Sequence, residues 1–278
     1  MTPDMILRWR KMVTGGVIRY SGLHTTSEMT LDGEKYTLYT LIGSGLLEVK
    51  GYENVRYWMC GGGANGVAAP NVSVAGGGGG GGYVTSGALI DGNYTVTIGA
   101  SQGTTSIAYA DGTKLTASGA SDINGASGGG QAGYYPYGYN KSTTSTGKGV
   151  STYPFGITSL YAHSAGGGGG NTCYDVGDDL GTSRGGTGGS NGNAGGSQTG
   201  NGNQKSRAPG GSRGGGSGGL GVNGTANTAG QAATFYGSGG GGGGVYYQVV
   251  DYSGMEYKTL GTGGAGYQGV AYVLIPAA

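Results

Sequence analysis

Short apolar segments alternate with polar turn residues in two parts of the chain, and their pattern predicts strands. The segments are rich in Val, Ile, Thr and Tyr and are bounded by Gly, Asn or Asp. They span residues 36–41, 46–49, 55–60, 94–98, 105–109, 114–117 and 270–275. The chain shows no apolar period of the kind that a long amphipathic helix produces. The sequence therefore predicts an all-β frame with essentially no α-helix.

Two features predict how these strands connect. Asp111-Gly112 separates two of the segments and is typical of a tight hairpin turn. The segment 270–275 is the most apolar run of the chain, and we expect it to pair with the strand that ends at Cys60. This pairing closes the frame across everything that lies between them.

Glycine dominates the chain between the first and last strands. It accounts for 72 of 278 residues, with runs at 61–63, 76–82, 128–130, 166–170, 214–216 and 239–244. Ordering a backbone costs about 1–2 kcal/mol per residue, and more for glycine, so a single run is not stable alone. In an extended helix of the polyproline II type, with three residues per turn, every N–H and C=O points outward and needs a partner. We therefore expect a bundle of polyglycine II helices that supply these partners to one another.

Composition excludes several other classes of protein. A collagen helix needs a sustained Gly-X-Y period and many prolines, whereas this chain has 6 prolines and no such period. Charged residues make up 10% of the chain and the net charge is +1, which gives no attraction to nucleic acid or to an anionic membrane. We find no signal peptide and no membrane-spanning segment, and expect synthesis in a host cytoplasm. Cys60 and Cys173 are expected to be plain thiols, with Cys60 buried in a strand.

The order of the motifs carries a resemblance. Tyr36-Thr37-Leu38-Tyr39-Thr40-Leu41, Gly43-Ser44-Gly45 and Val55–Cys60 with Gly61-Gly62-Gly63 come first, followed by the run 76–82, residues 92–100 and the closing residues 263–276. This order, over roughly residues 35 to 276, resembles the glycine-rich domain of phage and bacterial surface proteins, including the adhesins at the tips of phage tail fibres. The resemblance implies a β-sandwich of jelly-roll type that carries an inserted polyglycine II bundle. It also implies that variable loops between the glycine helices contact the host surface.

The resemblance divides the chain into two parts. Residues 1–34 lie outside it, and we expect them to attach the protein to a fibre or tail. Residues 35–276 form the glycine-rich domain. Its β frame is expected at residues 35–120 and 270–276, and its bundle and loops at residues 61–82 and 121–269.

Aromatic side chains gather between the glycine runs and are the candidate receptor contacts. On loops above a rigid scaffold they give a large contact area at a small cost in entropy, and tyrosine adds a polar group. The candidates are Tyr134, Tyr135, Tyr137, Tyr139, Tyr153, Phe155, Tyr161, His163, Phe235, Tyr236, Tyr246, Tyr247, Tyr252 and Tyr257. The alternative is that these side chains cover the bundle or build strands, and residues 245–250 have the pattern of a strand.

Three motifs have simpler explanations than the functions they suggest. Residues 264–269 match the GxGxxG dinucleotide fingerprint, but a strand follows them where a helix is required. Arg184-Gly185-Gly186 and Arg213-Gly214-Gly215 resemble RNA-binding RGG boxes without a basic surround. Asp175, Asp178 and Asp179 lack the spacing of a calcium loop. The two histidines, His24 and His163, do not assemble a catalytic group, so we expect no enzyme, cofactor or metal.

Two functions remain from different classes. The first is a virion adhesin on a tail fibre or tail tip that binds a bacterial surface receptor, protein or glycan. The second is a purely structural virion component, such as a fibre tip, connector or capsid decoration, whose loops contact other tail or fibre proteins. A third, a disordered RNA-binding chain, conflicts with ordered glycine runs. The residues favour no particular receptor or oligomeric state.

Overall fold

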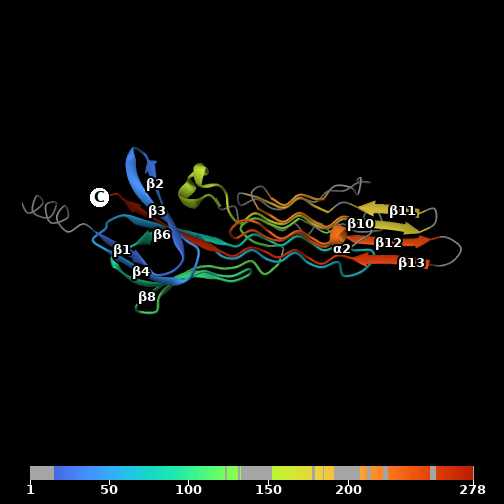
Figure 1. The fold of residues 1–278 in the computed structure, drawn as a ribbon, viewed down its shortest axis with the longest axis horizontal. Coiled ribbons are helices and arrows are strands. Elements are labelled where there is room, and N and C mark those ends of the chain that lie inside the picture. Colours follow the sequence, from blue (N-terminus) through green and yellow to red (C-terminus); the bar gives the residue numbers. More distant parts are fainter. Residues whose placement is uncertain are drawn as a thin grey trace, which may run out of the picture.

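The molecule is elongated, and a computed structural model shows three parts along its length. It describes residues 16–122, 124–130, 132, 152–176, 179–183, 185–190, 207–211, 214–221, 225–250 and 255–277. A β-sandwich occupies one end, a bundle of extended glycine-rich segments lies in the middle, and a four-stranded sheet occupies the other end (Figure 1). Helical turns in this part of the chain are limited to η1 (Pro154–Gly156), η2 (Thr158–Leu160) and α2 (Thr225–Thr228).

Two five-stranded antiparallel sheets form the sandwich. The first sheet contains, in spatial order, β1 (Val17–Tyr20), β4 (Gly45–Lys50), β7 (Gly92–Thr97), β8 (Thr105–Tyr109) and β9 (Lys114–Ala117). The second contains β2 (His24–Leu31), β3 (Glu34–Leu41), β14 (Val270–Pro276), β5 (Val55–Cys60) and β6 (Val84–Leu89). The prediction of an all-β sandwich is confirmed.

Strand β14 is buried on both faces, which explains why its sequence is continuously apolar. Ala271, Val273 and Ile275 face the core between the two sheets. Val270, Tyr272 and Leu274 belong to a second apolar cluster on the other face of the sheet. Because neither face meets water, no polar residue alternates with the apolar ones.

Both predicted connections are confirmed. Val270 is in register with Cys60 in the antiparallel pair of β14 and β5, so the last strand does close the frame. At the β8–β9 hairpin, Gly112 has φ +87°, a conformation that favours glycine. The Asp111 carboxylate accepts a hydrogen bond from the Thr113 N–H at 2.8 Å, which fixes the turn.

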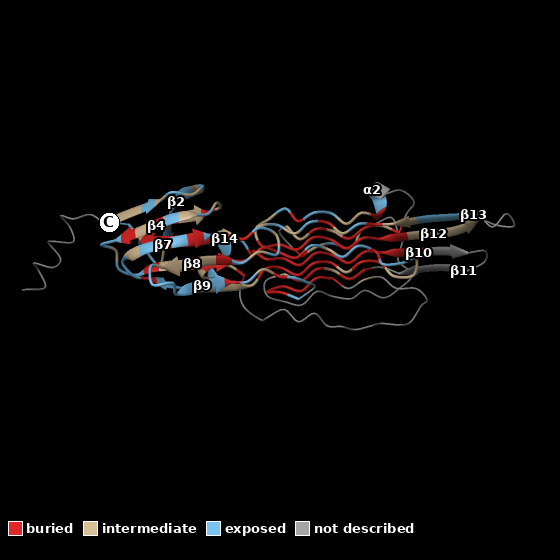
Figure 2. Cartoon of the chain, turned by 90° about the horizontal axis from the view of Figure 1, so that it is seen from below, coloured by how far each residue is buried: buried red, intermediate tan, exposed pale blue. Residues whose placement is uncertain are grey.

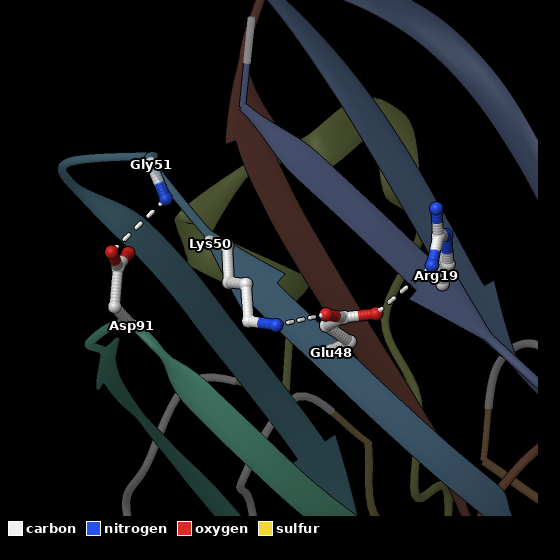
Figure 3. Close-up of polar contacts among 5 residues, drawn as sticks. All are labelled: Arg19, Glu48, Lys50, Gly51 and Asp91. Carbon is white, nitrogen blue, oxygen red and sulfur yellow. Dashed lines mark hydrogen bonds and ion pairs between the residues drawn. The ribbon is translucent and has the colours of Figure 1, made fainter. Parts of the chain in front are cut away.

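The boundary predicted after residue 34 requires a correction. Strand β1 pairs with β4 and strand β2 pairs with β3, so residues 17–31 already belong to the frame. Figure 3 shows the surface of the β1–β4 pair, where Glu48 lies between Arg19 at 3.6 Å and Lys50 at 2.5 Å. A hydrogen bond and the charge of Lys50, together with the charge of Arg19, lower the pKa of Glu48. Strand β2 (HTTSEMTL) lies at the sheet edge, and only two of its residues are apolar, which is why the pattern missed it.

Each glycine segment of the middle part bonds to several neighbours, and the run 239–244 shows how. Its N–H groups donate in turn to segments 165–168, 64–67 and 228–231, with N···O distances of 2.7–2.9 Å. Its carbonyl groups accept in turn from segments 216–219, 76–79 and 261–264 over the same distances. Successive residues bond to different segments, and every third residue bonds to the same segment again. A central run is therefore bonded to six surrounding segments, and we call this assembly the glycine bundle.

The glycine bundle continues the strands of the sandwich. Antiparallel pairing of β5 with β6 sets Cys60 opposite Val84. Beyond it the same register persists, because the N–H groups of Gly61, Ala64 and Val67 donate to the carbonyls of Tyr83, Gly80 and Gly77. The register between β5 and β14 likewise runs on into segments 63–69 and 261–267. The sheet thus sets the alignment from which the glycine segments start.

Close approach of backbones explains the need for glycine. A Cβ placed on Gly241 would lie 1.9 Å from the carbonyl oxygen of Ser217, and one on Gly167 would lie 1.9 Å from that of Gly240. These are hard contacts with backbone that is itself held by neighbours. Figure 2 shows that the segments in the middle of the bundle are buried although they carry no side chains.

The distal sheet, at the end of the bundle farthest from the sandwich, has the order β11-β10-β12-β13. It consists of β10 (Thr172–Val176), β11 (Asp179–Ser183), β12 (Val245–Val250) and β13 (Met255–Leu260). Strands β10 and β12 are parallel because they continue the parallel glycine runs 165–171 and 239–244. The strand predicted at residues 245–250 is confirmed.

Replacing Gly241 by alanine tests the close packing of the bundle. We expect the free energy of unfolding to fall by about 3 kcal/mol or more, because the added methyl group overpacks a site walled by backbone. Guanidinium denaturation measures the change. The control is Gly92→Ala in β7, where the added Cβ lies 3.4 Å from the Tyr94 ring and the expected change is within about 1 kcal/mol. Equal denaturation midpoints for the two variants would contradict the packing described here.

Candidate functional site

The structure divides the aromatic candidates into two separate groups. Where the bundle meets the sandwich lie Tyr153, Phe155, Tyr161, His163, Phe235 and Tyr236. In the distal sheet lie Tyr246, Tyr247 and Tyr257. Outside the described residues lie Tyr134, Tyr135, Tyr137, Tyr139 and Tyr252. The described candidates thus form two surfaces at opposite ends of the bundle.

The first group covers the outer face of the second sheet. The loop 152–164, with η1 and η2, places Phe155 and Leu160 against a buried cluster that includes Trp58 and Tyr272. This loop shields apolar side chains that would otherwise face water on that side of β14. Phe155 therefore has a packing role, as the structural alternative for these residues proposed.

His163 is fully buried, which corrects its assignment as a receptor contact. Its Nδ1 lies 3.0 Å from the carbonyl oxygen of Tyr161, and its Nε2 lies 2.8 Å from the hydroxyl of Tyr272. A carbonyl only accepts, so we assign Nδ1–H as the donor and leave Nε2 to accept from the tyrosine. Burial lowers the pKa of His163 to about 4 and raises that of Tyr272. The pair is therefore neutral at pH 7.

Phe235 and Tyr236 surround the buried histidine. The ring centroids of Phe235 and His163 are 4.8 Å apart, and the Tyr236 ring stacks on His163 at 6.3 Å. Tyr236 also meets Tyr267 edge to face at 5.7 Å. Both candidates are half-buried, so their larger contribution is to fasten the bundle to the sandwich.

The second group lies on an open sheet. Tyr246 donates from its hydroxyl to Oε1 of Gln248 at 2.5 Å, and Gln248 is in register with Tyr257 on the neighbouring strand. These three residues share one face, because alternate positions of a strand face the same side. Tyr257 is 43% exposed, and Met255 next to it is 54% exposed. Tyr247 lies on the opposite face, in register with Lys258.

Sequence reasoning missed two residues that hold the first group together, Trp58 and Tyr272. Their rings flank His163 at centroid distances of 5.2 and 5.3 Å. Both are in predicted strands. The alternation of side chains along a strand is the signal that places them on the outer face. They are opposite each other in the β5–β14 pair, on the face turned away from the sandwich core.

Among the described residues we looked for metal ligands, a reactive thiol and a membrane-spanning helix. No group of three or more His, Cys, Asp or Glu among them is arranged to hold a metal ion. Cys60 is fully buried, and burial raises the pKa of its thiol to about 12, so the reactive thiolate is absent at neutral pH. None of the helices in the described ranges is long and apolar enough to cross a membrane.

Comparison with known proteins gives no match. No protein-family model, no curated protein and no solved structure is similar to this chain.

Acid should weaken the fold through His163. In the unfolded chain a histidine binds a proton near pH 6.5, whereas the buried His163 binds one near pH 4. The unfolded state therefore holds more protons between these values, and the free energy of unfolding decreases by about 3 kcal/mol as pH falls from 6.5 to 4.

Two variants isolate this effect in urea denaturation curves measured across that pH range. His163→Gln keeps an amide that donates and accepts but does not titrate, so its free energy of unfolding should be less dependent on pH. His24→Gln should retain the dependence of the unaltered protein. Parallel pH curves for the unaltered protein and His163→Gln would show that His163 is not the buried neutral group described above.

Proposed function

We propose that the protein is a phage virion component, a tail-fibre or tail-tip adhesin that presents aromatic residues to a bacterial surface receptor. The observation that carries the proposal is the glycine bundle, in which a central run is bonded to six surrounding segments. Such cross-linking makes a stiff rod, and the rod holds the distal sheet far from the sandwich (Figure 1). A rigid support that exposes tyrosines at one end suits binding at a distance from the particle.

The conformation assigned to the glycine segments in this proposal is polyglycine II. Hydrogen-bond partners that return at every third residue support it, because a helix of three residues per turn points successive N–H groups in three directions. None of residues 239–244 is among the glycines with positive φ, as the same assignment requires. The adhesin-like resemblance of the sequence implies this architecture as well.

Hydrogen exchange tests the lattice directly. The amides of residues 239–244 should exchange at least about 1,000-fold more slowly than in an unstructured glycine peptide, because each is bonded and buried. Mass spectrometry of deuterated fragments that cover this run measures the rate. Exchange at the rate of the free peptide would instead support the disordered RNA-binding alternative.

The receptor contact in this proposal is the exposed face of the distal sheet that carries Tyr246, Gln248 and Tyr257. Tyrosines of this kind supply apolar area together with a hydroxyl, which suits either a glycan or a protein receptor. The tyrosines at positions 134–139, which lie outside the described residues, remain candidate receptor contacts. Residues 1–15 then serve attachment to other tail or fibre proteins, and the protein acts on the virion without enzymatic activity, cofactor or membrane insertion.

A purely structural virion component is the second candidate. The half-buried and buried aromatic residues around His163 favour it, since they pack the protein against itself and leave fewer side chains for a receptor. In that case the distal sheet contacts another virion protein, and its edge strand β13 is the surface that a neighbouring chain meets.

A paired substitution in the distal sheet separates the two candidates. We expect Tyr246→Ser combined with Tyr257→Ser to weaken binding of the fluorescent full chain to susceptible bacteria by about 10- to 100-fold, as loss of central aromatic contacts does. A panel of bacterial strains is first screened with the unaltered protein. Tyr267→Ser is the matched control, because Tyr267 is 38% exposed but lies outside the distal sheet.

Virions that carry the same variants complete the test. Normal particles that no longer attach to cells support the adhesin. Particles that fail to assemble support the structural component.

A further inference from the structure

A groove lies on the sandwich, away from both the glycine bundle's run 239–244 and the distal sheet. It has a volume of about 800 Å³ and lies between strand β6 and the loop that carries η1. Its main lining residues are Arg56, Trp58, Thr85, Ser86, Tyr153 and Phe155. The groove combines one cation, hydroxyl groups and aromatic rings in one concave surface, which is the usual make-up of a ligand site.

Strand β6 forms one side of the groove, and its exposed side chains there are small. Ser86, Gly87 and Ala88 are exposed along it. A Cβ on Gly87 would lie 2.9 Å from the ring of Tyr57, so a larger residue there would displace that ring. Small residues along an extended strand leave room for a linear ligand.

Arg56 is the only charged residue that lines the groove among those described. Its guanidinium carbon lies 5.3 Å from the centroid of the Phe155 ring. It forms no ion pair and no side-chain hydrogen bond with the described residues, unlike Arg19 and Lys50, which share Glu48. A guanidinium carries five N–H donors in a planar fork that matches a carboxylate. Within the described part of the chain, no acidic side chain neutralises the positive charge of Arg56.

The wall of the groove is held in an unusual backbone conformation. Phe155 has φ +54°, a region that non-glycine residues rarely adopt, and the buried Pro154 precedes it. Residues kept in this region by their surroundings cluster at binding sites, where their position is fixed before the ligand arrives. Here the Phe155 ring lies over the guanidinium of Arg56 and so forms part of the wall beside the cation.

We propose that this groove binds a linear acidic polysaccharide whose sugar carboxylate pairs with Arg56. The aromatic rings of Tyr153 and Phe155 pack on the apolar face of a sugar ring, and the hydroxyl of Ser86 bonds to sugar hydroxyls. A peptide that adds to β6 as a further strand fits less well. Near its start β6 is already tied to the first sheet, because Tyr83 N–H donates to Ser118 and the Thr85 hydroxyl donates to Thr116.

A titration with hexagalacturonate, a linear uronic acid oligosaccharide, tests the proposal. The full chain with Trp9→Phe leaves Trp58 as the sole tryptophan, and its fluorescence should change on binding because it lines the groove. The methyl-esterified hexasaccharide has the same sugars without the charge and should bind about 10- to 100-fold more weakly. Hexaglutamate and an oligomer of glycerol phosphate stand for an acidic peptide and a phosphate polymer.

Substitutions of Arg56 test whether its charge binds the sugar carboxylate. Arg56→Gln should weaken binding of hexagalacturonate by about 10- to 100-fold, and Arg56→Lys should recover only part of it, because lysine lacks the fork. Arg19→Gln is the matched control, since Arg19 is an exposed cation on the other sheet. Should Arg56→Gln fold poorly by circular dichroism, Ser86→Phe fills the groove from an exposed position, leaves Trp58 the sole tryptophan and should also abolish binding.

Several results would overturn the proposal. These are no binding of hexagalacturonate at millimolar concentration, equal binding of its methyl ester, tighter binding of either acidic control polymer, and unchanged affinity in a folded Arg56→Gln variant. The adhesin proposal does not depend on any of them. The paired Tyr246→Ser and Tyr257→Ser variant should bind hexagalacturonate normally.

Discussion

Backbone hydrogen bonds between glycine segments are the interaction on which the rest of this molecule depends. A run such as 239–244 has no side chains to bury, so its order rests on partners for every N–H and C=O. These partners lie on six different segments, which range from residue 64 to residue 264. No segment is held until its neighbours are in place, and the bundle therefore forms as one cooperative unit.

The sandwich sets the register in which the glycine segments of this unit align. Strands β5, β6 and β14 enter the bundle directly, and their sheet register continues into segments 61–67, 77–83 and 261–269. The buried aromatic residues around His163 then fasten the loop 152–164, which leads into the run 166–170. Side-chain packing at one end thus organises a region that has almost no side chains of its own.

Sequence alone predicts the strands whose apolar pattern is strong. Residues 55–60, 105–109 and 114–117 are strands with the predicted bounds, and the pairing of Val270 with Cys60 follows from the apolar closing run. The edge strands β2 and β13 were missed because hydrogen bonds to one neighbouring strand hold them and they bury few side chains. Strand β2 is mostly polar, and β13 is exposed over most of its length. The burial of His163 also escapes local reasoning, because its partner Tyr272 is 109 residues away in the chain.

The return of hydrogen-bond partners at every third residue constrains how the glycine runs change length. Deleting one glycine from the run 239–244 turns each later amide by about a third of a turn, toward a different neighbour. Removing three residues preserves the direction of every later amide and moves the following residues by one turn along their neighbours. Natural insertions and deletions inside these runs should therefore occur in multiples of three residues, because only such changes keep each amide directed at the same neighbouring segment.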